Sequence, residues 1–119
     1  MLKGSCHCGA VGFELPRPPE TLTDCNCSIC RRLGTLWAYY REDEVRFTAG
    51  ADATDSYAWG DRLLAFHRCR TCGCTTHWQG LSPERANRMG VNARLLDPKD
   101  IAGIRVRHLD GADTWKFLD

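Results

Sequence analysis

All eight cysteines of this 119-residue chain fall into three short groups, at residues 6–8, 25–30 and 69–74. A chain of this length buries only about two-thirds of the surface that its unfolded form exposes, so its hydrophobic core is modest. A metal ion that ties distant groups together would therefore matter for stability. The cysteine grouping constrains the fold more strongly than any other feature of the sequence.

The sequence gives no sign of export or of a membrane span. Its first residues lack the apolar run of a secretory signal, and no stretch approaches the ~20 apolar residues that cross a bilayer. We therefore expect a cytoplasmic protein in which clustered cysteines are metal ligands or catalytic thiols rather than disulfides. Sixteen basic residues against 15 acidic ones give a net charge of +1, which does not indicate nucleic-acid binding.

Short alternating segments predict a mainly-β protein, and we expect residues 1–119 to form a single domain. Val11, Phe13 and Leu15 alternate with polar or small residues, which is the period of a half-buried strand. Similar segments predict strands at residues 2–5, 10–15, 22–24, 36–41, 45–48, 56–59, 63–68, 75–79, 90–96 and 104–108. Short helical turns are expected at 28–33, ending at Gly34, at 82–84, where Ser82 is the N-cap and Pro83 the first helical residue, and at 97–103.

Two of the cysteine groups have the form of a structural zinc site. Cys6-x-Cys8 and Cys69-x-x-Cys72 are each followed by a glycine, as in tight metal-binding turns. Structural zinc takes four ligands, commonly two from each of two such turns. Four thiolates would close the tetrahedron and leave no position for a substrate, so we expect this zinc to join the N-terminal hairpin to the mid-chain hairpin.

The central group suggests a second zinc with a different task. Cys25, Cys27 and Cys30 supply three ligands from one turn, and three protein ligands with an open fourth position are the form of a catalytic zinc. Three thiolates would leave a net charge near −1, which makes the ion a poor activator of water. Such a soft site suits an incoming sulfur ligand, so the sequence indicates thiol chemistry, with the second site fully or partly occupied.

Several residues near these groups keep alternative interpretations. Arg31 and Arg32 either bind the carboxylates of a thiol-bearing metabolite such as glutathione or are ordinary surface charges near the cluster. Cys74 is either a fourth ligand of the second zinc, an auxiliary thiol near a site, or a small buried residue. His77 is a candidate proton shuttle or a structural residue, and Trp59 is a candidate lip over the second zinc.

The ordered motifs resemble the glutathione-dependent formaldehyde-activating enzyme (GFA) family. They are residues 4–11, Cys25-x-Cys27-Ser28-x-Cys30-Arg31, Cys69-x-x-Cys72-Gly73, and the segments 90–94 and 109–111. The resemblance implies a β-tent of antiparallel strands that zinc staples together. It also implies a structural zinc on Cys6, Cys8, Cys69 and Cys72, and a catalytic zinc on Cys25, Cys27 and Cys30 that glutathione can reach. The implied activity is formation of S-hydroxymethylglutathione from formaldehyde and glutathione.

Three hypotheses about function follow. The leading one is a zinc-dependent carbon–sulfur lyase-type enzyme acting on glutathione, or a similar thiol, and a small aldehyde. The alternative is a non-catalytic, zinc-stapled binding or scaffold module, which predicts that Cys74 closes the second site. Nucleic-acid binding through Arg31, Arg32, Arg68 and Arg70 is the third, and the near-neutral charge disfavours it.

Overall fold

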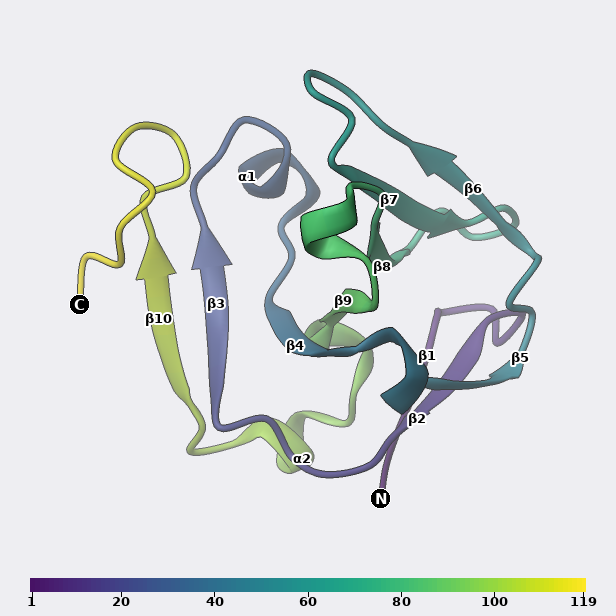
Figure 1. The fold of residues 1–119 in the computed structure, drawn as a ribbon. Helices are drawn as coiled ribbons and strands as arrows, with labels where there is room; N and C mark the ends of the chain where they lie inside the picture. Colours follow the sequence, from purple (N-terminus) through teal and green to yellow (C-terminus); the bar gives the residue numbers. More distant parts are fainter.

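The computed structural model describes residues 1–119 as two β-sheets linked by short helical turns (Figure 1). The smaller sheet has the order β1-β2-β5, with bounds β1 Leu2–Ser5, β2 Gly12–Leu15 and β5 Arg46–Ala49. The larger has the order β10-β3-β4-β9-β8-β7-β6. Its bounds are β3 Thr21–Cys25, β4 Trp37–Arg41, β6 Thr54–Tyr57, β7 Leu64–Cys69, β8 Thr75–Gly80, β9 Arg88–Asn92 and β10 Arg105–Leu109. The mainly-β prediction is confirmed.

Pairing is antiparallel throughout the two sheets, with one exception. β10 runs parallel to β3, which sets Leu109 opposite Cys25, and Figure 1 shows the two arrows side by side and pointing the same way. The chain reaches β10 through α2 (Pro98–Ile101), which begins with Asp97 accepting a hydrogen bond from the Lys99 backbone N–H at 3.0 Å. The last strand therefore ends beside the central cysteine group.

The helical segments are all short, and the predicted strand over residues 90–96 was wrong. α1 (Cys30–Leu33) ends at Gly34, whose φ of 69° is the left-handed conformation that glycine adopts readily. The segment 90–96 is not one strand, because Asn92 accepts a hydrogen bond from the Arg94 N–H and starts the 3₁₀ turn η3 (Ala93–Leu95). As predicted, Ser82 is the N-cap residue of η2 (Pro83–Arg85) and Pro83 is its first residue, although the Ser82 side chain accepts no capping hydrogen bond.

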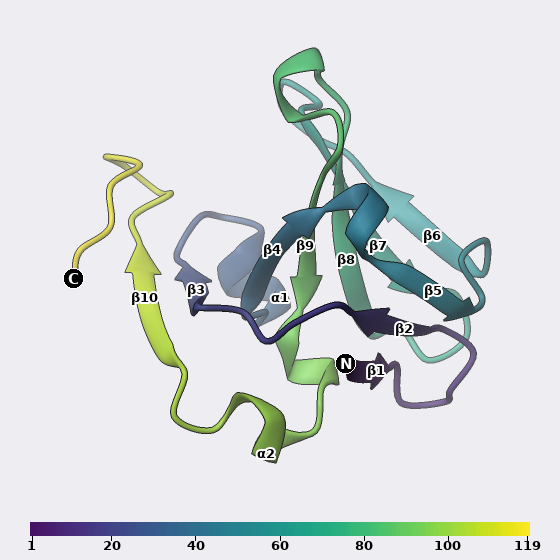
Figure 2. The ribbon, with the colours of Figure 1, turned by 60° about the horizontal axis from the view of Figure 1, so that its bottom comes forward.

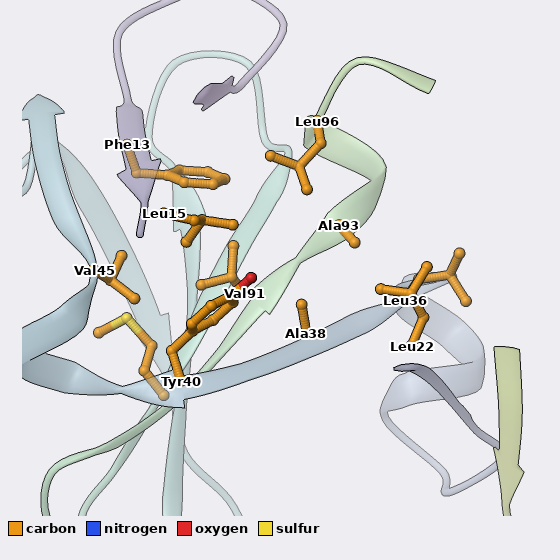
Figure 3. Packing of buried hydrophobic residues seen from close by; sticks show 11 residues of the cluster. Phe13, Leu15, Leu22, Leu36, Ala38, Tyr40, Val45, Val91, Ala93 and Leu96 are labelled. Atoms are coloured by element: carbon orange, nitrogen blue, oxygen red, sulfur yellow. The ribbon is translucent and has the colours of Figure 1, made fainter. Parts of the chain in front are cut away.

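Alternation along β4 separates the main core from a second face of the large sheet. Ala38 and Tyr40 point toward Phe13 and Leu15 of β2, and Figure 3 shows these side chains gathered with Val91 of β9. In Figure 2 the strands of the small sheet run across the direction of β8 and β9, so the small sheet covers one face of the large one. The residues that alternate with Ala38 and Tyr40 lie on the opposite face.

None of the helical segments is long and apolar enough to span a membrane. The longest helices contain four residues, so the turns between strands, rather than helices, position the cysteine groups.

Candidate functional site

Four cysteines from two distant turns lie together where the two sheets meet. Cys6 and Cys8 follow β1 of the small sheet, and Cys69 and Cys72 belong to the end of β7 and the turn before β8. The β7–β8 hairpin has this cysteine turn at its tip, as the sequence predicted. The four sulfurs all lie within 4.8 Å of one another, so they can hold one metal ion between the sheets.

The spacing of these sulfurs fits a zinc site. A tetrahedral zinc with Zn–S bonds of about 2.3 Å separates its sulfur ligands by about 3.8 Å. The Sγ atoms of Cys6 and Cys8 are 3.7 Å apart and those of Cys8 and Cys69 are 3.6 Å apart. A disulfide would need about 2.05 Å, and all eight cysteines are free thiols here. Backbone N–H groups point at two of the sulfurs, from Val11 to Cys6 and from Cys72 to Cys69.

The second group is built from one turn at the end of β3. Cys25 is the last residue of β3, Cys30 is the first of α1, and their sulfurs and that of Cys27 lie within 4.8 Å of one another. The backbone N–H of Cys30 donates to Cys27 Sγ at 3.4 Å, and the indole N–H of Trp37 donates to Cys30 Sγ at 3.3 Å. Three soft donors so held fit a zinc ion that keeps a position for another ligand.

The three thiols of this turn are not electrostatically equivalent. A hydrogen bond from the Cys30 thiol and backbone N–H groups lower the pKa of Cys25 from 9.0 to about 6, against the opposing effect of burial. The same hydrogen bond and burial raise the pKa of Cys30. In the four-cysteine group, the backbone N–H groups of Cys74 and Cys8 lower the pKa of Cys72 to about 5. Each group thus holds at least one sulfur whose lowered pKa favours the thiolate form.

A cavity of about 800 Å³ lies against the three-cysteine turn. Trp37 and Tyr39 of β4 line this cavity. They alternate along the strand with the core residues Ala38 and Tyr40, so the cavity lies on the face of the large sheet opposite the main core. Trp78 of β8 occupies the space that Gly90 leaves on the neighbouring strand, where a Cβ would overlap the indole ring. Fourteen of the 22 lining residues are hydrophobic, so the cavity suits a ligand with substantial apolar surface.

Three guanidinium groups line this otherwise apolar cavity. Arg31 follows Cys30 in α1, Arg85 ends η2, and Arg88 begins β9. None of the three side chains forms an ion pair or a hydrogen bond within the chain, and Asp61 is the one carboxylate in the lining. Unpaired guanidiniums on the wall of a cavity favour an anionic ligand.

Other residues that the sequence singled out lie at different distances from this cavity. Arg32 is absent from the lining, and its guanidinium donates to the Ser28 carbonyl at 2.7 Å. Cys74 packs beside the four-cysteine group rather than the three-cysteine group. His77 is buried against Phe47 and stacks on His67, away from the cavity. Trp59 does line the cavity, although it follows β6 instead of belonging to a strand.

Sequence reasoning missed that Arg85, Arg88 and Tyr39 line the cavity, and it did not place the segment 109–115 beside the cysteine turn, although residues 109–111 were noted as resembling the family. Strand alternation could have grouped Trp37 with Tyr39 on one face. Nothing in the local sequence connects Arg85 or Arg88 with residue 25, because that proximity depends on β4 and β9 being neighbours in the sheet.

Comparisons with known proteins agree with the cysteine pattern. Residues 1–108 match the model of a family described as glutathione-dependent formaldehyde-activating enzyme. A Halomonas elongata protein named "Putative glutathione-dependent formaldehyde-activating enzyme" is 54% identical over 33 residues, which are 27% of this chain and 21% of that protein. The chain therefore aligns with about a fifth of the length of this curated relative.

A solved structure extends the similarity over most of the fold. The crystal structure of a Rhodobacter sphaeroides protein is 35% identical to this chain and superimposes with a TM-score of 0.72. The superposition covers 88% of this chain and 99% of that one. The two proteins therefore share their sheet architecture almost completely.

Proposed function

Because the chain belongs to the glutathione-dependent formaldehyde-activating enzyme family, we propose that it is a zinc-dependent enzyme of the carbon–sulfur lyase type. It joins the thiol of glutathione, or of a similar anionic thiol, to a small aldehyde, or releases the two from their adduct. The observation that carries this proposal is the three-cysteine turn, which opens onto a cavity that three unpaired arginines also line.

The two cysteine groups have separate roles in this proposal. The structural metal would be held by Cys6, Cys8, Cys69 and Cys72, and the catalytic one by Cys25, Cys27 and Cys30. When bound in the three-cysteine group, zinc supplies a soft Lewis-acid position that favours the thiolate form of a sulfur ligand. Cys74 lies beside the other group, which supports an open rather than a closed catalytic site.

The arginines orient the thiol substrate. A glutathione-type molecule carries carboxylates at both ends with its thiol between them. Arg31 belongs to the helix of the cysteine turn, whereas Arg85 and Arg88 belong to η2 and β9. Guanidinium groups bind carboxylates with paired hydrogen bonds, so these residues can fix the ends of the substrate while its sulfur faces the cysteines.

The bond change needs no oxidant or reductant. The substrate sulfur forms a bond to the aldehyde carbon, the carbonyl π electrons move to oxygen, and the thiol proton ends on that oxygen. Tyr39 lines the cavity, and burial raises the pKa of its hydroxyl above the usual value of 10.0. The phenol therefore stays protonated at neutral pH and can donate a hydrogen bond to the oxygen as it gains charge.

The test compares exchange between free glutathione, formaldehyde and S-hydroxymethylglutathione with and without the protein, measured by NMR. We expect a rate above the uncatalysed one, lost in Cys27→Ser with the thermal unfolding midpoint little changed. Cys74→Ser is the matched control, since it removes a thiol outside the three-cysteine group and should keep the excess rate.

Two measurements together would contradict the enzymatic proposal. If no thiol–aldehyde pair reacts faster with the protein than without it, and added thiols leave the spectrum of the cobalt-substituted protein unchanged, the chain is a metal-stapled binding module and the enzymatic proposal is wrong.

A further inference from the structure

The segment 109–115 forms one side of the cavity, and we call it the C-terminal wall. Leu109, Gly111, Ala112 and Trp115 all line the cavity. The match to the family model covers residues 1–108, so the wall follows it directly, although residues 109–111 also resemble the family. β10 delivers it to this position, because the parallel pairing of β10 with β3 sets Leu109 opposite Cys25.

Asn26, which sits between two of the cysteines, fastens this wall to the cysteine turn. Its side-chain amide donates to Asp110 Oδ1 at 3.0 Å, and its side-chain oxygen accepts from the Ala112 N–H at 2.9 Å. Its backbone N–H donates to the Leu109 carbonyl at 3.2 Å. One residue thus makes three hydrogen bonds to three residues of the wall, across more than 80 positions of sequence.

The wall is also folded on itself around one carboxylate. Asp110 Oδ2 accepts from the Thr114 hydroxyl at 2.9 Å, and the Asp110 carbonyl accepts from the Trp115 N–H at 2.8 Å. Trp115 has a φ of 60°, a conformation that bulky residues rarely adopt and that these bonds must maintain. The indole remains mostly exposed while it lines the cavity.

Gly111 allows the wall to approach the cysteines closely. A Cβ at this position would lie 2.6 Å from Cys25 Sγ and 3.1 Å from Cys27 Cβ. The wall therefore contacts the three-cysteine turn directly, and a small displacement of it would change the shape of the cavity beside the sulfurs.

We propose that Asn26 is a positioning residue that holds the C-terminal wall over the three-cysteine turn, and that Trp115 on this wall determines which thiols the cavity accepts. This inference rests on the proposed function. A large thiol such as glutathione extends from the sulfurs onto the wall and contacts the Trp115 ring. A small thiol such as 2-mercaptoethanol ends before it reaches the wall, so its binding does not depend on Asn26 or Trp115.

The experiment titrates glutathione and 2-mercaptoethanol into the cobalt-substituted protein and follows the sulfur-to-cobalt absorption. In Asn26→Ala and Trp115→Ala we expect glutathione to bind at least tenfold more weakly, with 2-mercaptoethanol and metal content unchanged. Asp113→Asn is the control within the wall, because its exposed side chain makes no hydrogen bond or ion pair.

An exchange of partners tests the hydrogen bond itself. Asn26→Asp removes the amide donor and sets two carboxylates together, which should weaken glutathione binding as Asn26→Ala does. The double variant Asn26→Asp/Asp110→Asn again has one amide and one carboxylate at positions 26 and 110, with their places exchanged. We expect it to recover most of the affinity for glutathione.

Two negative results have different meanings. If the unchanged protein binds glutathione and Asn26→Ala binds it equally well, or loses both thiols to the same extent, the positioning inference is wrong. If the unchanged protein binds neither thiol, the proposed function is wrong and the specificity role of the wall is wrong with it.

Discussion

The indole N–H of Trp37 donates to Cys30 Sγ at 3.3 Å, joining a fully buried aromatic residue of β4 to the cysteine turn. A donor aimed at a ligand sulfur fixes its orientation and stabilises its thiolate form, which is how residues behind a metal site tune the metal. Because Trp37 also lines the cavity, the same side chain contacts both the three-cysteine turn and the cavity beside it.

Replacing Trp37 by phenylalanine should weaken metal binding at the three-cysteine turn by about 10–100-fold, the range seen when partners behind metal ligands are removed. Competition with a chelator of known affinity measures this. Trp78→Phe is the matched control, since it shortens another aromatic side chain of the same cavity that makes no hydrogen bond to a cysteine. Equal metal affinities in the two variants would contradict this role of Trp37.

Loss of the four-cysteine group should destabilise the fold far more than loss of the three-cysteine group. Cys8 and Cys69 are 61 residues apart in sequence, so a metal between them restricts a long loop, whereas Cys25 and Cys30 belong to one turn. We expect Cys72→Ser to lower the thermal unfolding midpoint by about 10 °C or more, as a loss of ~3 kcal/mol would do in a chain of this size. Cys27→Ser should lower it by much less. Calorimetry with zinc analysis checks both.

Arg31 and Arg88 should each contribute to binding an anionic thiol, although one is adjacent in sequence to the cysteines and the other is not. Removing one charged hydrogen-bonding partner costs about 1.5–3 kcal/mol, so Arg31→Ala and Arg88→Ala should each raise the KM for glutathione about 10–100-fold. Arg32→Ala should have little effect, because Arg32 is absent from the cavity lining. Arg46→Ala, on the small sheet, serves as a charge control. Steady-state kinetics would contradict the assignment if Arg32→Ala had the larger effect.

Gly90 should be replaceable only if Trp78 is made smaller. A Cβ at Gly90 would overlap the Trp78 indole, so Gly90→Ala should destabilise the protein by about 1–3 kcal/mol, as overpacking of a filled interior does. In the double variant Gly90→Ala/Trp78→Phe the smaller ring leaves room, and the two effects should be less than additive. Urea denaturation of the four proteins measures this coupling, and simple additivity would show that the two side chains do not compete for space.

The end of the chain should loosen as the pH rises through the raised pKa of His108. His108 Nδ1 donates a hydrogen bond to the Asp119 carboxylate at 2.6 Å, and this bond and the charge of the carboxylate raise the pKa of His108 above 6.5. Because the folded pKa is the higher one, the stabilisation is complete below about pH 6.5 and is lost as the pH rises through the folded value. NMR titration should give His108 a pKa above 6.5, falling toward 6.5 in Asp119→Asn. An unchanged pKa in that variant would remove the ion pair as the cause.

The predictions that succeeded from sequence depend on short-range geometry. Phe13 and Leu15 of β2 both point into the main core because a strand places alternate side chains on one face, and Gly34 ends α1 because glycine adopts the left-handed conformation. The cysteines of one turn, from Cys25 to Cys30, must lie near each other whatever the rest of the fold does. Local spacing also predicted the pairing of the Cys6–Cys8 and Cys69–Cys72 turns, since neither pair completes a four-ligand site alone.

Arg32 and Cys74, whose roles the sequence left open, are placed by local geometry rather than by strand pairing. Arg32 is adjacent to Arg31, yet one turn of helix directs it to the Ser28 carbonyl instead of the cavity. Cys74 follows Cys72 so closely that it stays with the four-cysteine group, which excludes it from the site at residue 25.

By itself the sequence determined the β-rich architecture, the three-cysteine turn and the soft chemistry that thiols favour, because each follows from residue type and spacing within a few positions. The four-ligand preference of zinc then indicated that the Cys6–Cys8 and Cys69–Cys72 turns belong together. Only the tertiary structure decided that Arg85, Arg88 and the C-terminal wall join the central cysteines around one cavity. The physical reason is that strand order in the sheet depends on which whole faces are buried against each other. No single segment contains that information.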